Sequence, residues 1–462
     1  MKGGAQEFDK EGVNKDAQEG VKEGVGEQDS IETTRFSRVA AMAGTGMRVG
    51  VNYLKHYGKR AIGAASGADE LQEANASAVY ETFSRLKGGP LKLAQMLSID
   101  RNLLPPAYAN QFAKAQYSAP PLSYPLVVRT FRREFNREPL QIFDSFSKHA
   151  AHGASIGQVH RASKDGAEYA VKVQYPGVAD SLRTDIRVLK PIALSVLGLK
   201  EHDVADYLRE IETRLLEETD YSLELRRSQE LSSKSAHLKH VRFVKYYPEW
   251  STSRILSMDW VDGVTLDKYA DGNASQLERD QVGQALWDFY EHQVHTLRVF
   301  HADPHPGNFL VKDGELWVLD FGCTKELDEV FYRKQFRFLD PTLADNPSRL
   351  EAALVSLDIL LPEDDPEKKA RITAVCERSI RLLGLPFWGD SFDFGDPNFM
   401  RAIYEMGEAN AREQQSRDLS GRRGSADSVY VHRAYFGLYS LLSRLRARVR
   451  VGLPEWVRGM EE

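Results

Sequence analysis

Cysteine and long apolar runs are both scarce in this chain of 462 residues. Its two cysteines, Cys323 and Cys376, are far apart and form no CxxC unit. This argues against a metal–thiolate site and fits a reducing compartment. The most apolar stretches, such as IALSVLGL at residues 192–199, are far shorter than the ~20 residues that a membrane-spanning helix needs. We therefore expect no integral membrane protein.

The chain also lacks a strong excess of either charge. Its formal net charge is −6, which gives no global reason to expect a nucleic acid as partner. Hydrophobic residues make up 42% and charged residues 28%, both ordinary for a soluble globular protein. The length exceeds the size at which a single hydrophobic core usually stops growing, so two or more lobes are expected.

The N-terminal region has two parts of opposite character. Residues 1–33 are acidic and poor in apolar side chains, unlike a secretory signal or an Arg-rich transit peptide, and predict a disordered tail. Residues 34–68 contain no Asp or Glu but six Lys or Arg in an apolar background. Such a segment could lie on an anionic membrane surface, or it could be a helix packed on the body with its basic edge in solvent.

The rest of the chain first has a helical and then a mixed pattern. Residues 69–117 indicate helices with a break at residues 88–90, and SAPPLSYP at residues 118–125 resembles a boundary. The runs QVHRA and AEYAVKVQY are strand-like and are joined by SKDG, a strong hairpin signal. A second hairpin is expected in NFLV-KDG-ELWVLDFG.

This pattern predicts an α+β fold with a small sheet-containing lobe followed by a helical lobe. The expected division is a disordered tail at residues 1–33, a helical N-terminal extension at 34–125, an N-lobe at 126–258 and a C-lobe at 259–462. Such an outline is typical of a bilobal enzyme that transfers phosphoryl groups from nucleotides.

The stretch FHADPHPGNFLV at residues 300–311 has three interpretations. It could be a metal site with His301, Asp303 and His305 at alternate positions, since these ligand types suit zinc or iron. It could be a Pro/Gly/Asn turn, or a catalytic loop. Ligands at every second position lie on one side only if the segment is a strand, and prolines are disfavoured in strand interiors.

The residues that follow favour the catalytic loop. LDFG places Asp320 twelve residues after Asn308. Phosphoryl transfer from a magnesium nucleotide needs a carboxylate near the attacking oxygen, an amide and a carboxylate on the metal, and a cation on the phosphates. Asp303 and Asn308 have the HxDxxxxN spacing and Asp320 opens a DFG triplet. These residues predict Asp303 as a catalytic residue and Asn308 and Asp320 as ligands of Mg²⁺.

The cation is expected from a strand upstream. YAVKVQY places Lys172 where protein kinases have the VAIK-type lysine that contacts the α- and β-phosphates. A second Asp-Phe-Gly, beginning at Asp393, has no catalytic loop before it. We interpret this second triplet as part of an aromatic-rich structural loop.

Several motifs together resemble the UbiB family of atypical kinases, the AarF/ADCK group. They are LKLAQMLS, AAHGASIGQVHRA, KVQYPGV, EETDYSLE and HADPHPGNFLV. QYPGVADSL, the late FDFG and HRAYFGLYSLL look closest to the ADCK branch associated with coenzyme Q. The resemblance spans residues 75–445 and implies a bilobal protein-kinase-like fold.

The resemblance implies two regulatory motifs. Lys92 and Gln95 match the ends of the KxGQ motif, with Ala94 in place of the glycine, on a helical extension over the site where a protein kinase would receive its peptide. Their spacing puts both on one helical face. Glu218 and Asp220 match the ExD motif that engages this lysine. Without the family match, these two carboxylates would be interpreted as a solvated helix face.

The resemblance also implies a nucleotide site. Glu224 fits the helical glutamate that pairs with Lys172. The family's alanine-rich loop takes the place of the glycine-rich loop of protein kinases and supplies Ala154, Ser155, Ile156 and Gly157. His152 and Gly153 depart from the alanines that are usual in this loop, which bears on the preference between ATP and ADP.

Three further residues are predicted from their position. Met258 in MDWV is the candidate for the gatekeeper beside the adenine, or else a core methionine, and Val261 follows it in the hinge. His305 stands where many protein kinases have a catalytic-loop lysine. An imidazole with an ordinary pKa of about 6.5 stabilises the charge of a transition state less well at neutral pH.

The C-terminal helix predicted in YFGLYSLLSRLRARVRV has two interpretations. It carries four arginines beside leucines, namely Arg444, Arg446, Arg448 and Arg450. These could contact anionic lipid, or the helix could close the large lobe.

We therefore expect an ATP- and Mg²⁺-dependent kinase or ATPase that supports isoprenoid-quinone or related lipid metabolism. The expected partners are a nucleotide, an anionic or quinone-related lipid and a biosynthetic enzyme complex, with no nucleic acid. The expected location is cytoplasmic, peripheral on the inner membrane face. Two alternatives stay open: a small-molecule phosphotransferase of the choline or aminoglycoside kinase type, and a non-catalytic nucleotide-binding scaffold.

Overall fold

The computed structural model describes residues 68–86, 122–154, 156–197, 215–302, 304–415 and 423–458, together with residues 44, 209 and 212–213. The predicted tail at residues 1–33 lies outside these ranges. So does the predicted basic segment at 34–68, apart from residues 44 and 68. The first long described helix is α2 (Ala68–Leu86), within the predicted helical extension.

The N-lobe is built on a five-stranded antiparallel sheet. Its strands are β1 (Ser145–Phe146), β2 (His152–Gly153), β3 (Gly157–Lys164), β4 (Ala167–Gln174) and β6 (Ile255–Asp259), in the order β1-β3-β4-β6 with β2 also paired to β3. The predicted hairpin between β3 and β4 is confirmed. It turns through Asp165 at φ 52° and Gly166 at φ 78°, where a positive φ favours glycine or a short polar residue.

Successive side chains of a strand point to opposite faces of the sheet, and residues paired across two strands share a face. The two faces of this sheet therefore carry different residues. Lys172 pairs with Val159 on one side and with Leu256 on the other. The alternate residues, which include Val171 and Val173, instead form a core cluster with α5 (Tyr124–Phe135). One face therefore presents Lys172 and the opposite face is closed by a helix.

Helix α5 is suited to cover the sheet. A proline in its first turn has the φ angle that a helix start needs, and Asn136 ends it in the left-handed region at φ 54°. Val127 and Phe131 are four residues apart, so they lie on one side of the helix, and both are fully buried.

Two further helices belong to this part of the chain. They are α6 (Val178–Leu197) and α8 (Tyr221–Ser235). Helix α8 follows the ExD-like motif, and its first turn carries Glu224.

A second sheet holds the other hairpin. Its strands are β5 (Val241–Phe243), β10 (Glu315–Val318), β9 (Phe309–Lys312) and β7 (Val264–Thr265), in that order. The predicted hairpin between β9 and β10 is confirmed, with Asp313 and Gly314 at positive φ. Nearby, β8 (Val299–His301) pairs with β11 (Thr324–Glu326), so the strand before the catalytic loop lies beside the strand after the DFG triplet.

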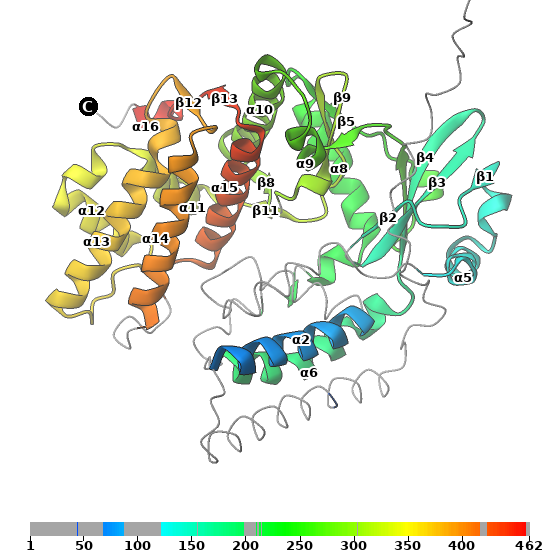
Figure 1. Ribbon diagram of the computed structural model, residues 1–462, viewed down its shortest axis with the longest axis horizontal. Helices are drawn as coiled ribbons and strands as arrows, with labels where there is room; N and C mark the ends of the chain where they lie inside the picture. Colours follow the sequence, from blue (N-terminus) through cyan, green and yellow to red (C-terminus); the bar gives the residue numbers. More distant parts are fainter. Residues whose placement is uncertain are drawn as a thin grey trace, which may run out of the picture.

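Helices make up most of the C-lobe (Figure 1). They are α9 (Leu266–Asp271), α10 (Gln276–Glu291), a π-helical turn (His292–Leu297), α11 (Glu329–Phe336), α12 (Pro347–Ser356), α13 (Pro366–Leu383), α14 (Pro397–Gln415), α15 (Ala426–Leu445) and α16 (Glu455–Arg458). Figure 1 shows α15 between the helices α11 to α14 and the strands of the catalytic region. The largest hydrophobic cluster joins α10, α11, α14 and α15 to these strands.

The second Asp-Phe-Gly lies in this helical part. Asp393 ends β12 (Ser391–Asp393), which pairs with β13 (Arg448–Arg450). Its carboxylate accepts hydrogen bonds from the Arg448 guanidinium at 2.9 Å and from the Gly395 N–H at 2.8 Å. These contacts agree with the interpretation of this triplet as a structural loop.

The C-terminal arginines border a packed helix. Leu442 and Leu445 of α15 are fully buried. Arg444 forms an ion pair with Asp271 at 2.6 Å, at the end of α9. Helix α15 therefore closes the large lobe, as one of the two interpretations predicted. The predicted helix was too long, however: it ends at Leu445, Arg446 takes the left-handed conformation at φ 53°, and Arg448 and Arg450 lie in strand β13. Among the described residues, no helix is both long and apolar enough to cross a membrane.

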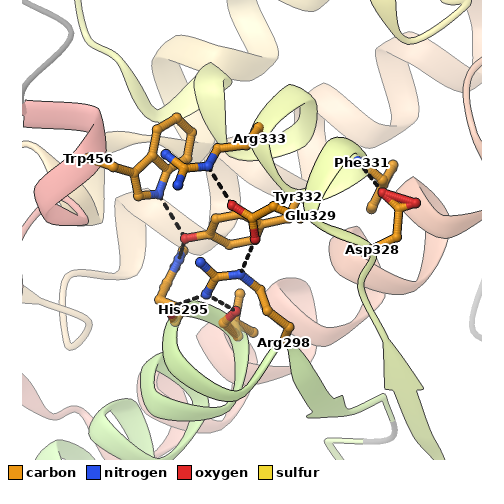
Figure 2. Close-up of polar contacts among 9 residues, drawn as sticks. His295, Arg298, Asp328, Glu329, Phe331, Tyr332, Arg333 and Trp456 are labelled. Atoms are coloured by element: carbon orange, nitrogen blue, oxygen red, sulfur yellow. Dashed lines mark hydrogen bonds and ion pairs between the residues drawn. The ribbon is translucent and has the colours of Figure 1, made fainter.

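The C-terminal helix α16 is anchored by an aromatic contact (Figure 2). The Trp456 indole N–H donates a hydrogen bond of 2.8 Å to the hydroxyl oxygen of Tyr332 in α11. The same hydroxyl lies 2.8 Å from His295 Nδ1 in the π-helical turn. Two guanidinium groups cover the rings: Arg298 lies 3.5 Å from the ring centre of Tyr332, and Arg333 lies 4.6 Å from that of Trp456.

Candidate active site

The centre of the candidate site is a lysine that contacts two carboxylates. Lys172 Nζ in β4 lies 2.9 Å from Glu224 Oε1 and 3.0 Å from Glu224 Oε2. The same nitrogen lies 3.1 Å from Asp320 Oδ2. A strand of the N-lobe, a helix and the DFG segment therefore meet at one ammonium group, as protein-kinase catalysis requires of these parts.

Glu224 is held in place by the start of α8. Asp220 caps this helix, because its carboxylate accepts a hydrogen bond of 2.9 Å from the Ser222 N–H. Tyr221, at the first helical position, is fully buried, and its ring centre lies 4.9 Å from Lys172 Nζ. The cap thus fixes where the helix begins, and Glu224 follows one turn later against the lysine.

The proton affinities of the three groups differ because of burial and mutual charge. Burial alone would lower the pKa of Lys172, but Asp320 and Glu224 hold this pKa well above its usual value. Burial alone would raise the pKa of Asp320, yet the Lys172 ammonium and the Gly322 N–H keep it below its usual value. Burial and the charge of Asp320 raise the pKa of Glu224 to about 7. At neutral pH the lysine is therefore charged and Asp320 is ionised.

The β9–β10 hairpin brings Asn308 close to Asp320 in the fold. The Leu319 N–H donates a hydrogen bond of 3.0 Å to the Asn308 carbonyl, so the residue before Asp320 is tied to Asn308. The Gly322 N–H donates to Asp320 Oδ1 at 2.5 Å. A Cβ atom on Gly322 would lie 2.9 Å from this oxygen and 3.4 Å from Glu224 Oε2, so the glycine leaves room for both carboxylates.

Asp303 lies outside the described residues, but both neighbouring segments are described. The Ala302 N–H donates to the Cys323 carbonyl at 2.8 Å, one residue after the DFG triplet. On the other side, His305 is the N-cap of a short 3₁₀ turn (Pro306–Asn308), and its Nδ1 accepts a hydrogen bond of 3.1 Å from the Gly307 N–H. Because Nδ1 accepts, any proton of a neutral His305 ring is on Nε2.

The alanine-rich loop joins β2 to β3. The Ala154 N–H donates to the Gly157 carbonyl at 2.9 Å, and Ser155 lies outside the described residues. Ile156 is buried, and its carbonyl accepts a hydrogen bond of 2.9 Å from the Tyr175 N–H. A Cβ on Gly157 would lie 2.5 Å from the Val173 carbonyl oxygen, so only glycine fits there without a shift.

Met258 and Val261 lie near this loop in the fold. Met258 pairs with Ala170 on the same sheet face as Lys172. It is 7% exposed and packs in a cluster with Ile156, while Val261 is partly buried against the same cluster. Met258 is thus a buried core residue that also faces the lysine side of the sheet, so the two interpretations of this methionine are compatible.

The regulatory motifs are described only in part. Lys92 and Gln95 lie outside the described residues. Glu218 is half-buried, and its charge helps to raise the pKa of Glu224. Asp220 has the capping role given above, so its carboxylate is engaged by its own helix start. This contact does not depend on the KxGQ-like segment.

The comparisons with known proteins decide the family. The model of the ABC1 atypical kinase-like domain matches residues 114–352, about half of the chain. The chain belongs to the ABC1 atypical kinase-like family. This confirms the resemblance to the UbiB, AarF and ADCK proteins and the bilobal kinase-like fold.

Named relatives extend over most of the chain. The mitochondrial atypical kinase COQ8B of Rattus norvegicus is 27% identical over 91% of this chain and 79% of its own length. The mitochondrial atypical kinase COQ8 of Saccharomyces cerevisiae is 26% identical over 91% of this chain and 84% of its own length. The probable serine/threonine-protein kinase abkA of Dictyostelium discoideum is 31% identical over 67% of this chain, which spans 57% of that protein.

A solved structure shares the fold. It is the complex of Rv3197 with erythromycin from Mycobacterium tuberculosis, with a TM-score of 0.55 and 22% sequence identity, covering 83% of this chain and 95% of that chain. At this identity the likeness concerns the fold alone.

The donor atoms of the site suit a magnesium nucleotide. The side chains of Asn308 and Asp320 offer amide and carboxylate oxygens, which hard cations such as Mg²⁺ prefer. Within the described ranges, no group of three or more His, Cys, Asp or Glu residues could hold a metal ion. The alternative metal site of His301, Asp303 and His305 includes Asp303, which lies outside those ranges, so this site stays a prediction.

The sequence alone did not predict the buried hydrogen bonds of Gln158 and His160, which connect strand β3 of this site to neighbouring segments. Gln158 Oε1 accepts a hydrogen bond of 2.7 Å from the Leu122 N–H, which ties β3 to the segment before α5. Gln158 Nε2 lies 2.9 Å from His160 Nε2, and His160 Nδ1 lies 2.8 Å from the Ser147 carbonyl. Because a carbonyl only accepts, Nδ1 donates in this contact, and because an amide nitrogen only donates, Nε2 accepts from Gln158. The motif SIGQVH was a usable signal, but only as a family match.

Proposed function

We propose that this protein is an ATP- and Mg²⁺-dependent atypical kinase or ATPase that supports ubiquinone-type isoprenoid-quinone metabolism or related lipid metabolism at a membrane surface. The observation that carries the proposal is the contact of Lys172 with both Glu224 and Asp320, at 2.9 Å and 3.1 Å. A buried ammonium between two carboxylates would be costly to desolvate as a purely structural feature, whereas a phosphate-binding site needs such a charge.

Each residue has a proposed role. Lys172 binds the α- and β-phosphates and Glu224 orients it. Asn308 and Asp320 would hold Mg²⁺, whose charge would stabilise the negative phosphates. Asp303 positions the nucleophile. The loop residues Ala154, Ser155, Ile156 and Gly157 cover the phosphates, and Met258 and Val261 border the adenine.

The two regulatory motifs limit which molecule can accept the phosphoryl group. We propose that Lys92 and Gln95 lie on a helix over the site where a protein kinase receives its peptide, and that Glu218 and Asp220 engage that helix. This arrangement argues against phosphorylation of a separate protein. Hydrolysis of ATP, or transfer to a small lipid-linked acceptor, is easier to accommodate.

Domains, location and partners follow the same reasoning. We propose an N-terminal extension at residues 34–125, an N-lobe at 126–258 and a C-lobe at 259–462, after the tail at 1–33. We also propose peripheral contact with anionic or quinone-related lipid on the inner face of a membrane, beside a complex of biosynthetic enzymes. Two relatives of this chain, COQ8 and COQ8B, are named as mitochondrial proteins.

The test is Mg²⁺-dependent ATP hydrolysis by the purified protein, with and without anionic liposomes, against Asp320→Asn. Turnover that rises with liposomes and is lost in the variant would support the proposal. Tight nucleotide binding without turnover, with or without lipid, would instead indicate a nucleotide-binding scaffold. Transfer to one alcohol in a broad acceptor screen, without any effect of lipid, would indicate a small-molecule phosphotransferase.

A further inference from the structure

A glycine in the middle of α15 lies against the catalytic loop. If Gly437 carried a Cβ atom, this atom would lie 2.0 Å from Pro304 Cγ and 2.9 Å from Pro304 Cβ. Real Cβ atoms essentially never approach another heavy atom this closely. The helix backbone and the proline ring therefore meet at a distance that only glycine permits at this position.

A glycine at this place is otherwise unfavourable. Glycine is among the weakest helix formers, and Gly437 lies well inside α15 (Ala426–Leu445). Its backbone has no positive φ angle that would call for glycine. Close packing against Pro304 is therefore the physical reason for a glycine here.

Of the two partners, the helix is the less able to move. Asp427 near its start forms an ion pair of 2.7 Å with Lys325 in β11. Tyr439 donates a hydrogen bond of 2.9 Å to the Leu383 carbonyl at the end of α13. Beside the glycine, Leu438 is fully buried in the main core cluster.

Pro304 belongs to the catalytic loop, which is held less firmly than α15. The proline is half-exposed, as is His305, in the loop between β8 and the short 3₁₀ turn that begins at Pro306. Pro304 directly follows Asp303 in the chain, and its ring restricts the backbone on both sides. A side chain at position 437 would therefore displace the loop that carries Asp303 more than it would displace α15.

We propose that Gly437 is a positioning residue, which sets the place of the catalytic loop by seating Pro304 against α15. The proposal rests on the proposed function for its effect on turnover, because only a catalytic Asp303 makes the loop position matter to the rate. It extends the site to a helix about 130 residues further along the chain.

The experiment places the same substitution at three helical glycines. Gly437→Ala meets Pro304, Gly283→Ala in α10 meets Ala447 Cβ at 2.3 Å, and Gly407→Ala in α14 has no described heavy atom within 4 Å. For each variant we would measure kcat and KM for Mg-ATP hydrolysis, the thermal midpoint Tm, and amide hydrogen exchange of the peptide spanning residues 299–309.

We expect Gly437→Ala to lower kcat by about 10- to 100-fold with KM for ATP changed less than about twofold, since misplacing a catalytic group by ~1 Å costs rates of this order. Hydrogen exchange at residues 299–309 should increase. Gly407→Ala should leave kcat unchanged, and Gly283→Ala should lower Tm without lowering kcat per folded molecule.

A second substitution removes the closest part of the obstacle. Pro304→Ala deletes the Cγ that would lie 2.0 Å away and leaves the Cβ at 2.9 Å. The double variant Gly437→Ala/Pro304→Ala should therefore recover kcat relative to Gly437→Ala, with Pro304→Ala alone as its reference. It should also fold if Gly437→Ala does not.

Several outcomes would overturn the proposal. They are an unchanged kcat in Gly437→Ala, a loss of Tm without a loss of kcat per folded molecule, and a loss of kcat that Pro304→Ala does not relieve. If the wild-type protein shows no turnover, the proposed function fails instead. Hydrogen exchange would still decide the loop contact, because unchanged exchange at residues 299–309 in a folded Gly437→Ala variant would refute it.

Discussion

The hydroxyl of Tyr246 donates a hydrogen bond of 2.9 Å to the carbonyl oxygen of Leu319, the residue before Asp320. Tyr246 is buried and forms a β-bridge with Met258, whereas Leu319 follows the β9–β10 hairpin. One side chain thus connects the strand that holds the candidate gatekeeper to the segment that carries the proposed Mg²⁺ ligand.

Loss of this hydroxyl should lower both stability and turnover. Tyr246→Phe leaves the partly buried Leu319 carbonyl without this donor, and a polar group left unsatisfied away from water costs about 1–3 kcal/mol. We expect the free energy of unfolding in urea to fall by this amount, and Mg-ATP turnover per folded molecule to fall because Asp320 is held less firmly. The neighbouring Tyr247 is a matched control, since its hydroxyl donates to Asp259 at 2.8 Å. Equal turnover in Tyr246→Phe and Tyr247→Phe would contradict the positioning role.

The two glycines at the alanine-rich loop, Gly153 before it and Gly157 at its end, should respond differently to substitution by alanine. Gly157→Ala would place its Cβ 2.5 Å from the Val173 carbonyl oxygen, whereas no described heavy atom lies within 4 Å of a Cβ on Gly153. We expect Gly157→Ala to weaken ATP binding about tenfold, or 1.4 kcal/mol, and to lower Tm. Gly153→Ala should leave Tm unchanged. Calorimetric titration with Mg-ATP and Mg-ADP measures both affinities, and equal effects at the two positions would count against the steric account.

Glu291 should make the protein less stable as the pH rises. Burial and the charge of Asp288 raise the pKa of Glu291 to about 8, from a usual value of 4.5. The folded state therefore binds more protons than the unfolded state between these values, so the free energy of unfolding falls as pH rises through this range and levels off above pH 8.

His295 has the opposite effect at lower pH, because burial and the charge of Arg298 lower its pKa to about 3. Stability from this group is lost as pH falls below about 6.5. Of these two groups, Glu291 should therefore determine how the free energy of unfolding changes between roughly pH 6.5 and 8. Urea unfolding at pH 6.5 and at pH 8 measures this change. The free energy of unfolding should decrease less between the two pH values in Glu291→Gln than in the wild type. An identical decrease would show that Glu291 is not protonated in the folded state.

Trp456 anchors the C-terminal helix α16 by two contacts, a hydrogen bond to Tyr332 and a ring contact with Arg333 (Figure 2). Two substitutions should separate their contributions to stability. Trp456→Phe keeps an aromatic ring beside Arg333 but loses the N–H donor to Tyr332, so we expect a loss of about 1 kcal/mol in the free energy of unfolding. Trp456→Ala loses both contacts and should cost about 2 kcal/mol or more. Chemical denaturation measures both values, and equal losses in the two variants would mean that the ring contact contributes nothing.

Local elements could be predicted because their signals lie within a few residues. Both Asp-Gly hairpins form as expected, since the short polar residue and the glycine take the positive φ angles that the turns require. Lys172 and Asp320 were identified from motifs, and the fold brings them within 3.1 Å. A sequence pattern that fixes a strand and its turn also fixes which face its lysine occupies.

Contacts between distant segments could not be predicted in this way. Nothing in the sequence near Tyr246 indicates that its hydroxyl reaches Leu319, because the contact depends on how two sheets are placed. Asp220 was assigned to a regulatory motif, and its capping of α8 became visible only where the helix begins. The approach of Gly437 to Pro304 likewise depends on the packing of α15, which residue spacing does not encode.

The alternation of side chains along β4 limits how this part of the chain can change length. Lys172 faces the catalytic side, and its neighbours Val171 and Val173 face the α5 side. An insertion or deletion of one residue between the hairpin turn and Lys172 would turn the ammonium into the apolar cluster and a valine toward the carboxylates. A change of two residues would preserve the facing. Length variation in this strand should therefore be tolerated only in pairs of residues, whereas the exposed turn at Asp165 and Gly166 has no such restriction.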